Sequence, residues 1–398
     1  MRSVLGGTTL IGITPIGILL SVGTANPYHY GTPVEGEQFT GRSRELSTLL
    51  ARMRDGINVV LISPRRYGKT SLLRAAGARA RRWRPSPAVV EVNLQRATSP
   101  ARFAALLTAA AYTMPGARWA RARQAVPEFL RRLRVTPSVS FDPGGNPRFG
   151  FDASLLPTEV DGVLSDVYQL LADEAEHRPA VLVIDEFQVA VRLGEHLPDL
   201  LKGLADAHPG VSLVLAGSKR HLMEQLVVQQ EAPLYGLAQR LALGPIPDAD
   251  MVAYLLERAA VGGKPSTEEV ARYLLGQGGP VPNDIQHLAY DAFEAAGERI
   301  DTAAVDAGMA AAVEHDATLF ADALGRFSPG QVRVLAALAV EPPAEPYAAA
   351  FARAVGLANA SSVRKALGPL MADDVVVLRD GRLVIADPFF AAWLRAET

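Results

Sequence analysis

The chain has 398 residues, more than one hydrophobic core usually organises, so we expect two or three domains. Apolar residues make up 49% of the sequence, which is ample for globular cores. The absence of cysteine excludes disulfides and thiolate metal sites, and the seven histidines show no paired ligand spacing. The net charge of -2 argues against attraction of the whole molecule to nucleic acid. A cytosolic protein fits these features best.

The start of the chain is unusually apolar. No charged side chain occurs from Ser3 to Tyr30, so length alone would allow residues 4–25 to anchor the chain in a membrane. Glycines, threonines and Pro15 dilute the apolar content, however. We therefore expect residues 1–25 to be an N-terminal extension or a mis-assigned start and the protein to be cytoplasmic, with a membrane anchor as the alternative.

Short β-branched runs alternate with helical patterns from residue 57 to about residue 246. This alternation is typical of an α/β fold class, with a parallel sheet covered by helices on both faces. Near-continuous apolar runs such as VLVI and SLVLA predict strands that are buried on both faces. The core is expected over residues 26–247, and its predicted strands are Ile57–Ile62, Ala88–Leu94, Ala180–Phe187, Val211–Ser218 and Leu241–Ile246.

A long insertion, residues 95–178, separates the second and third predicted strands. Its Pro/Gly cluster FDPGGNP at 141–147 predicts an exposed turn or hairpin between two helical portions. Residues 74–134 also carry thirteen arginines against two glutamates. We favour a solvated surface for this stretch, and contact with an acidic partner is the alternative.

After Pro247 the pattern becomes purely helical. Asp248, Ser266 and Asn283 are predicted to cap three helices, which makes residues 248–318 a separate helical subdomain. Further along, three helical segments precede VVVLRDGRLVIAD, which reads as two strands joined by an Asp380-Gly381 turn. Helices followed by such a hairpin predict a winged helix over residues 319–398.

The segment SPRRYGKTS follows a buried strand and opens a helical run, the context that a Walker A phosphate loop requires. Its backbone N–H groups would surround the β-phosphate of ATP. Lys69 would neutralise the β- and γ-phosphates, and the Thr70 hydroxyl would bind Mg²⁺. Ser63 replaces the first glycine of the motif, and we expect binding to be retained if its φ stays negative. The predicted ATP-binding loop is Ser63, Pro64, Arg65, Arg66, Tyr67, Gly68, Lys69, Thr70 and Ser71.

A second segment, VLVIDEF at 181–187, reads as an apolar strand that ends in two carboxylates. Because successive strand residues point to opposite faces, we expect the two acids to have different roles. Asp185 would hold Mg²⁺ through its water shell, and Glu186 would polarise the attacking water. An acidic pair alone is usually a solvated loop start, but a Walker A loop in the same sheet favours catalysis.

Three further positions are candidates, and two of them, Ser218 and Pro280, have an ordinary structural alternative. Ser218, at the end of the fourth predicted strand, would lie between the two catalytic strands and could hold the lytic water or sense the γ-phosphate. Arg240 could be an arginine finger that reaches the γ-phosphate of a neighbouring subunit in a nucleotide-dependent homo-oligomer. Pro280 follows Gly279 at a helix start, where it either contacts the nucleotide or only turns the chain.

Six segments carry a family resemblance, in this order: NPYHYGTPVEGEQFTGR, SPRRYGKTSLL, VIDEFQ, AGSKRHLMEQL, PLYGLAQRLALGPI and DPFFAAWLR. Together they resemble the archaeal-type ATPase family, on the border of the AAA+ and STAND groups. The resemblance covers residues 26–398 and implies a five-stranded AAA+-like core, a helical lid and a C-terminal winged helix. It also implies that the segment before the core, with Phe39, Gly41 and Arg42, contacts adenine.

The chain departs from the family pattern at Ser63, Lys219 and Leu237. Leu237 stands where the family would place an arginine, which weakens the case for an arginine finger. Arg240 is then the surviving candidate for that role.

The predicted winged helix offers basic side chains to a partner. Arg364 and Lys365 lie on the expected recognition helix, residues 360–374, and Arg379 and Arg382 lie in the wing. Residues 319–398 nevertheless hold eight basic and eight acidic side chains, so counterion release would add little to DNA binding. DNA binding and a protein-contact or autoinhibitory role are equal alternatives.

Our leading hypothesis from the sequence is a Mg-dependent ATPase switch that couples nucleotide state to a DNA or protein partner through the winged helix. The alternative is a nucleotide-gated adaptor with incidental hydrolysis, which would retain ATP and ADP with turnover near background. A small-molecule P-loop kinase is disfavoured, because the adjacent Asp185 and Glu186 suit water activation better than a substrate hydroxyl.

Overall fold

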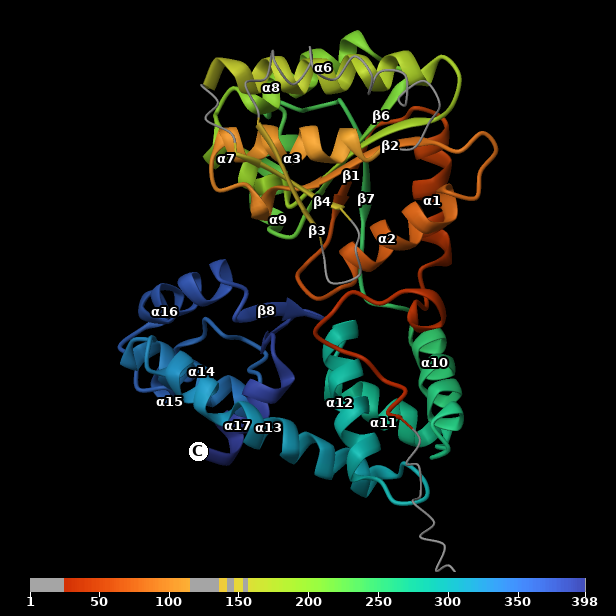
Figure 1. The fold of residues 1–398 in the computed structure, drawn as a ribbon. Helices are drawn as coiled ribbons and strands as arrows, with labels where there is room; N and C mark the ends of the chain where they lie inside the picture. The colour runs from red at the N-terminus through yellow and green to blue at the C-terminus, as the bar shows by residue number, and fades with distance from the viewer. Residues whose placement is uncertain (1–24, 115–135, 142–146, 153–156, 398) are drawn as a thin grey trace, which may run out of the picture.

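The computed structural model describes residues 25–114, 136–141, 147–152 and 157–397. They form an α/β core, a helical subdomain and a C-terminal winged helix (Figure 1). In Figure 1 the core lies at the top and the two smaller units lie beneath it. Residues 1–24, for which the sequence left a membrane anchor open, lie outside the described part. No helix within that part combines the length and apolar character that crossing a bilayer requires.

The core is built on a five-stranded parallel sheet in the order β2-β5-β6-β1-β7. Every residue of β1, β5 and β6 is buried, as their continuous apolar runs predict. The edge strands differ: in β2 buried positions alternate with partly or fully exposed ones, and β7 is largely exposed. The predicted α/β core is confirmed, with strands β1 (Val59–Ile62), β2 (Ala88–Asn93), β5 (Ala180–Asp185), β6 (Val211–Gly217) and β7 (Gln239–Ala242).

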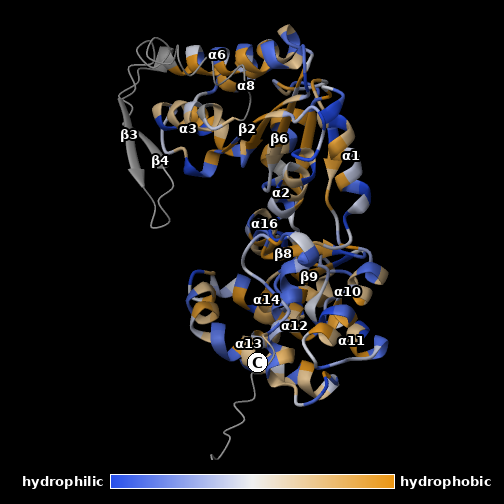
Figure 2. Cartoon of the chain, turned by 45° about the vertical axis from the view of Figure 1, so that its right-hand side comes forward, coloured by the Kyte–Doolittle hydropathy of each residue, from blue (hydrophilic) through white to orange (hydrophobic). Residues whose placement is uncertain are grey.

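Helices cover both faces of this sheet. Alternate residues of a strand point to opposite faces, so in β1 Val59 and Leu61 face one layer while Val60 and Ile62 face the other. The first layer is α1 (Ser43–Arg54) and α2 (Lys69–Ala80). The second contains α3 (Pro100–Tyr112), α6 (Pro157–Ala175), α7 (Ala190–Leu193), α8 (Leu197–Ala207) and α9 (Arg220–Met223). In Figure 2 the strands are mostly hydrophobic, whereas hydrophilic residues colour the outer faces of the helices.

Two strands end at least two residues before the predicted position, whereas β2 and β6 end one residue early. β5 stops at Asp185 rather than residue 187, because Glu186 adopts a left-handed conformation with φ 55° and ψ 40°. β7 ends at Ala242 rather than residue 246. Beyond it, the guanidinium of Arg42 donates hydrogen bonds to the carbonyls of Gly244 and Pro245, at 2.6 and 3.4 Å, so these carbonyls do not continue the sheet.

The insertion between β2 and β5 contains the predicted hairpin. β3 (Thr136–Phe141) and β4 (Pro147–Asp152) pair antiparallel along their whole length. The turn itself, residues 142–146, and residues 115–135 of the arginine-rich stretch lie outside the described residues. The helical portions on either side are α3 and α6, which pack against each other.

The helical subdomain confirms the predicted run of helices but not their caps. Asp248 is the first helical residue and makes no cap bond, and Thr267 rather than Ser266 caps α11. Asn283 lies inside α12, where its Oδ1 accepts a hydrogen bond from Gly31 N at 2.8 Å. The last helix crosses the predicted domain boundary at residue 318 without a break. The four helices are α10 (Asp248–Val261), α11 (Glu268–Gly278), α12 (Pro282–Ala295) and α13 (Thr302–Leu324).

The C-terminal unit has the predicted order of helices followed by a hairpin. Asp380 and Gly381 have φ of 49° and 78°, so both central residues of the turn take the positive φ that a tight two-residue hairpin requires. Phe390 and Trp393 of the last helix stack at 6.0 Å inside this unit. Its elements are α14 (Pro329–Val340), α15 (Ala349–Ala354), α16 (Ala360–Ala372), β8 (Val376–Arg379), β9 (Arg382–Ile385) and α17 (Pro388–Glu397).

Candidate functional site

The loop between β1 and α2 is shaped to receive an anion. Arg66 and Gly68 both have positive φ, of 68° and 87°. Residues of alternating handedness turn successive backbone N–H groups toward one side, which creates an anion-binding concavity. Gly68 adopts its conformation without strain because it has no Cβ. Lys69, the next residue, opens α2, whose N-terminus adds partial positive charge.

Ser63 fits at the start of this loop without a left-handed backbone. Ser63 is fully buried, and its φ is not positive. This is the condition under which we expect a serine to be tolerated at this position. Its backbone N–H donates to Gly217 O at 3.2 Å, and its hydroxyl donates to Pro64 O at 3.0 Å. The serine therefore joins the loop to the end of β6.

Lys69 is almost completely buried and pairs with the two acids at the end of β5. Its ammonium donates to Asp185 Oδ1 and, at 2.9 Å, to Glu186 Oε1. Asp185 is also buried, and its Oδ2 accepts a hydrogen bond from Asn93 Nδ2 at 3.2 Å. We call this group the strand-end cluster; it consists of Lys69, Asp185 and Glu186.

Glu186 is fixed by polar contacts on both carboxylate oxygens. Beyond the Lys69 contact, its Oε2 accepts hydrogen bonds from Ser218 Oγ at 3.0 Å and from Gln188 Nε2. Burial raises the pKa of Glu186, but the Lys69 ammonium and the hydrogen bonds outweigh this effect and hold the pKa below its usual range. Glu186 is therefore a carboxylate at neutral pH.

The expectation that strand alternation separates the two acids is wrong. Asp185 and Glu186 contact the same ammonium group. The reason is the left-handed backbone at Glu186, which ends the strand one residue before the alternation could place its side chain on the far face. The structure brings Ser218 to the same place from β6, which lies between β5 and β1.

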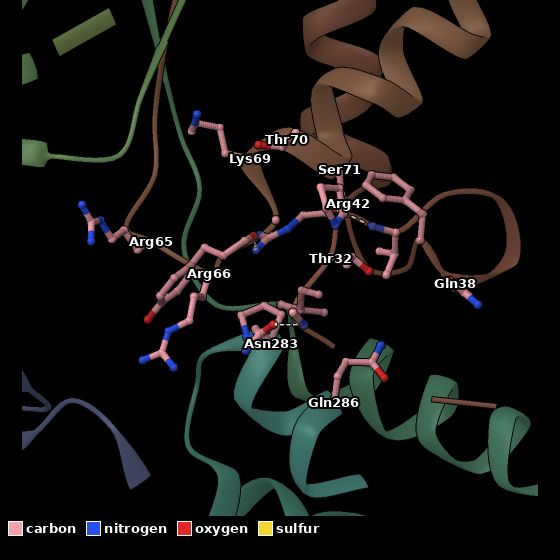
Figure 3. A pocket seen from close by; sticks show the side chains of 18 of the residues that line it. Thr32, Gln38, Arg42, Arg65, Arg66, Lys69, Thr70, Ser71, Asn283 and Gln286 are labelled. Atoms are coloured by element: carbon pink, nitrogen blue, oxygen red, sulfur yellow. Dashed lines mark hydrogen bonds between the residues drawn. The ribbon is translucent and has the colours of Figure 1, made fainter. Parts of the chain in front are cut away.

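A cavity of about 370 Å³ opens beside the strand-end cluster. It is lined by the loop from Pro64 to Ser71, by part of the segment 29–42, and by the start of α12. Figure 3 shows Lys69 and Thr70 at one end of this pocket and Gln286 at the other. A ligand that fills the cavity would thus touch the core and the helical subdomain together.

The segment that the family resemblance assigns to adenine borders this cavity. Phe39 and Arg42 line it directly. The guanidinium of the buried Arg42 makes contacts within the protein, because it also donates to Tyr67 O at 3.2 Å and pairs with Glu45 Oε1 at 3.1 Å. Gly41 is not part of the lining. It has a φ of 65° and packs so closely on Ile246 that a Cβ would lie 2.2 Å from the isoleucine side chain.

Besides Gly41, four predicted site residues are absent from the lining of the cavity: Ser63, Asp185, Arg240 and Pro280. Arg240 faces Val60 within the sheet, is exposed, and lies 3.8 Å from Glu224 Oε1. Pro280 is also absent from the lining, and Pro282, Asn283 and Gln286 of α12 take its place.

Some residues of the site escaped the sequence analysis. Asn93 ends β2, the neighbour of β5, and Gln188 follows the acidic pair in the DEFQ segment. The parallel sheet carries the signal for Asn93, because the carboxyl ends of neighbouring strands meet at one edge. Gln286 had no signal in the sequence, since its place at the cavity depends on how the two domains pack.

Comparisons with known proteins agree with this architecture. A family model described as "Probable winged helix domain" matches residues 318–396. A Walker-type ATPase of Pyrococcus abyssi is similar in structure, with 18% identity and a TM-score of 0.59, over 91% of this chain and 98% of that chain. The ORC1 protein of Aeropyrum pernix, solved in complex with DNA, has 17% identity and a TM-score of 0.49, over 91% and 94%. No curated protein matches the sequence.

The chain therefore has the fold of a Walker-type P-loop ATPase, with a five-stranded parallel core, a helical lid and a C-terminal winged helix. The resemblance to archaeal-type ATPases is confirmed at the level of the fold.

Proposed function

We propose that this chain binds Mg-ATP in the cavity, hydrolyses it, and couples its nucleotide state to a partner through the winged helix. The observation that carries the proposal is the strand-end cluster: one buried ammonium contacts two carboxylates beside an anion-shaped loop, and Ser218 holds one of them. These are the parts that phosphoryl transfer to water requires in P-loop enzymes.

The residues present suit a magnesium-bound triphosphate. The described residues hold no group of three or more acids and histidines gathered for a metal. One carboxylate, Asp185, and one hydroxyl, Thr70, are the sparse protein set that suits Mg²⁺, which keeps several waters and shares phosphate oxygens. The bound ion would neutralise the phosphate charge that builds up during transfer. Lys69 would turn from the carboxylates toward the β- and γ-phosphates.

In this proposal Glu186 accepts the proton of the attacking water. Its carboxylate is already ionised, and Ser218 and Gln188 fix its Oε2, so the oxygen that contacts Lys69 is the one left to face a ligand. Release of Lys69 toward the phosphates would free that oxygen for a water molecule. Removal of a positioned general base typically costs about 100-fold to 10,000-fold in rate.

The proposed partner surface is the recognition helix and wing of the winged helix. Arg364, Lys365 and Arg382 are exposed, and Arg364 lies over the ring of Tyr347 at 5.1 Å. Arg379 is half-buried instead, with its guanidinium beside Gly279 of the lid. A DNA or protein partner would contact Arg364, Lys365 and Arg382 directly. In a homo-oligomer, the exposed Arg240 would remain available to a neighbouring subunit.

The test is calorimetric titration of the purified chain with ATP, with and without Mg²⁺, together with phosphate release. We expect binding that improves with Mg²⁺ and slow turnover, and we expect Lys69→Ala to lose both. Lys69→Arg is the matched control, because it keeps the positive charge but replaces the compact ammonium with a guanidinium. It separates the effect of the charge from that of the ammonium group. Binding with turnover at background that Glu186→Gln leaves unchanged would favour the adaptor. No heat from Mg-ATP would refute the proposal.

A further inference from the structure

Arg66 joins the phosphate loop to both other domains. Its Nη1 donates to Asp284 Oδ1 of the lid at 2.9 Å. Its guanidinium also contacts Asp387 Oδ2 of the winged helix, at 3.4 Å from Nη1 and 3.5 Å from Nη2. In Figure 3 the Arg66 side chain extends toward the lid and away from Lys69. We call this group the junction cluster; it consists of Arg66, Asp284 and Asp387.

The lid holds the loop through main chain and side chain together. The backbone carbonyl of Arg66 accepts a hydrogen bond from Asn283 N at 3.4 Å, one residue before the acid that takes its guanidinium. The Asp284 side chain is fully buried, and its Oδ2 has no hydrogen-bond partner in the described residues. A buried carboxylate is costly unless it is paired. The lid therefore needs Arg66 at this place.

The winged helix presents Asp387 from a fixed position. Its Oδ1 accepts hydrogen bonds from the backbone N–H groups of Phe389 and Phe390, at 3.0 and 3.2 Å, which leaves Oδ2 for Arg66. Phe389 in turn packs on His287 of α12, with ring centroids 4.5 Å apart. The winged helix thus contacts the phosphate loop directly and the lid beside it.

The conformation of Arg66 gives these contacts a consequence for ligand binding. A non-glycine residue with φ of 68° is strained and persists only where its surroundings impose that conformation. The same φ helps to turn the N–H groups of the loop toward the anion site. The contacts to Asp284, Asn283 and Asp387 are the surroundings that can impose it.

We propose that Arg66 is a positioning residue through which the lid and the docked winged helix hold the phosphate loop in its nucleotide-binding form. This inference rests on the proposed function and names its coupling device. Docking of the winged helix then raises nucleotide affinity. By thermodynamic reciprocity, nucleotide strengthens docking by the same factor.

The test uses Asp387→Asn, which removes the charge but keeps an oxygen that can cap α17. The chain has no cysteine, so Val191→Cys and Val340→Cys, at exposed positions of the core and the winged helix, accept a fluorophore pair specifically. Interdomain distance is measured by energy transfer, and affinity for a non-hydrolysable ATP analogue with Mg²⁺ is measured by calorimetry. Asp373→Asn is the matched control, an exposed charge in the same domain.

We expect Asp387→Asn to lengthen the interdomain distance and to weaken analogue binding about fivefold or more. A saturating analogue should restore the docked distance, and Asp373→Asn should change neither quantity. Arg66→Gly, which keeps the backbone freedom but removes the guanidinium, should resemble Asp387→Asn in distance. Unchanged affinity or an unchanged distance in Asp387→Asn would overturn the coupling, whereas absent binding in the unmodified chain would overturn the proposed function itself.

Discussion

Two ion-pair clusters lie on either side of the phosphate loop and are built differently. The strand-end cluster belongs to one domain, and its acids lie at the end of one strand of the sheet. The junction cluster draws one residue from each of three domains, and the Arg66 side chain in it is 43% exposed. The sheet fixes the first cluster whatever the other domains do, whereas the second exists only while they are docked. The buried cluster is suited to chemistry, and the partly exposed junction cluster is suited to responding to domain arrangement.

Breaking the strand-end cluster should have the largest effect. Glu186→Gln keeps the shape of the side chain but removes the proton acceptor, so turnover should fall about 100-fold or more while Mg-ATP affinity changes little. Phosphate release and calorimetry on the same preparation check this. Asp161→Asn, a change at a partly exposed acid of the core that pairs with His196, is the control. A turnover that survives Glu186→Gln would remove Glu186 from the mechanism.

The junction cluster should show itself in the pH dependence of stability. Burial raises the pKa of Asp284 from 3.8 to about 6, an effect that Asp387 adds to and that Arg66 and His287 oppose. The folded state therefore holds this proton more tightly than the unfolded chain. The stabilising contribution is complete below about pH 4 and is lost as pH rises through about 6.

Denaturant unfolding of the unmodified chain and of Asp284→Asn measures this contribution. The asparagine cannot titrate. As the pH rises from 5 to 8, the unmodified chain should therefore lose about 1.5 kcal/mol of unfolding free energy relative to the variant. Equal pH profiles for the two proteins would show that Asp284 titrates normally.

Ser218→Ala tests how a neighbour of the strand-end cluster supports Glu186. The substitution removes one of two hydrogen bonds to Glu186 Oε2, while Gln188 keeps the other. We expect turnover to fall about fivefold with little change in affinity, because a hydrogen bond to a charged group is worth more than a neutral one. Steady-state phosphate release measures the effect. A loss as large as that of Glu186→Gln would assign Ser218 a direct role.

The smallest effect is expected at Arg240. Its side chain lies outside the cavity and near Glu224, so Arg240→Ala should change Mg-ATP affinity less than about twofold. Turnover of Arg240→Ala, measured over a range of protein concentrations, tests whether Arg240 acts between subunits. A loss confined to high concentration would identify an arginine finger between subunits.

The sequence predicted those parts that depend on local pattern. Continuous apolar runs identified the buried strands, and Lys69, Asp185 and Glu186 were named from their motifs alone. The Asp380-Gly381 turn was also predictable, since few residues accept two positive φ values. The left-handed Glu186 was not, because nothing in its neighbours requires a strand to end there.

Contacts between domains were beyond the sequence for a physical reason. Arg66 and Asp387 are 321 positions apart, and their approach follows from packing of whole domains rather than from any periodic pattern. The predictions of the helix caps were wrong for a related reason. Asn283 is a good cap by residue type, yet its side chain holds Gly31 from the segment before the core. In both cases a tertiary partner decided the outcome.

The unbroken course of α13 has a mechanical consequence. This helix of 23 residues begins in the lid beside α12 and ends in the winged helix, where α17 packs on it. In Figure 1 it runs from one unit into the other as a single rod. At 1.5 Å per residue it is about 34 Å long, so a tilt of about 10° at its lid end would displace its far end by about 6 Å. A rotation of α13 at its lid end would therefore be enlarged at the winged helix.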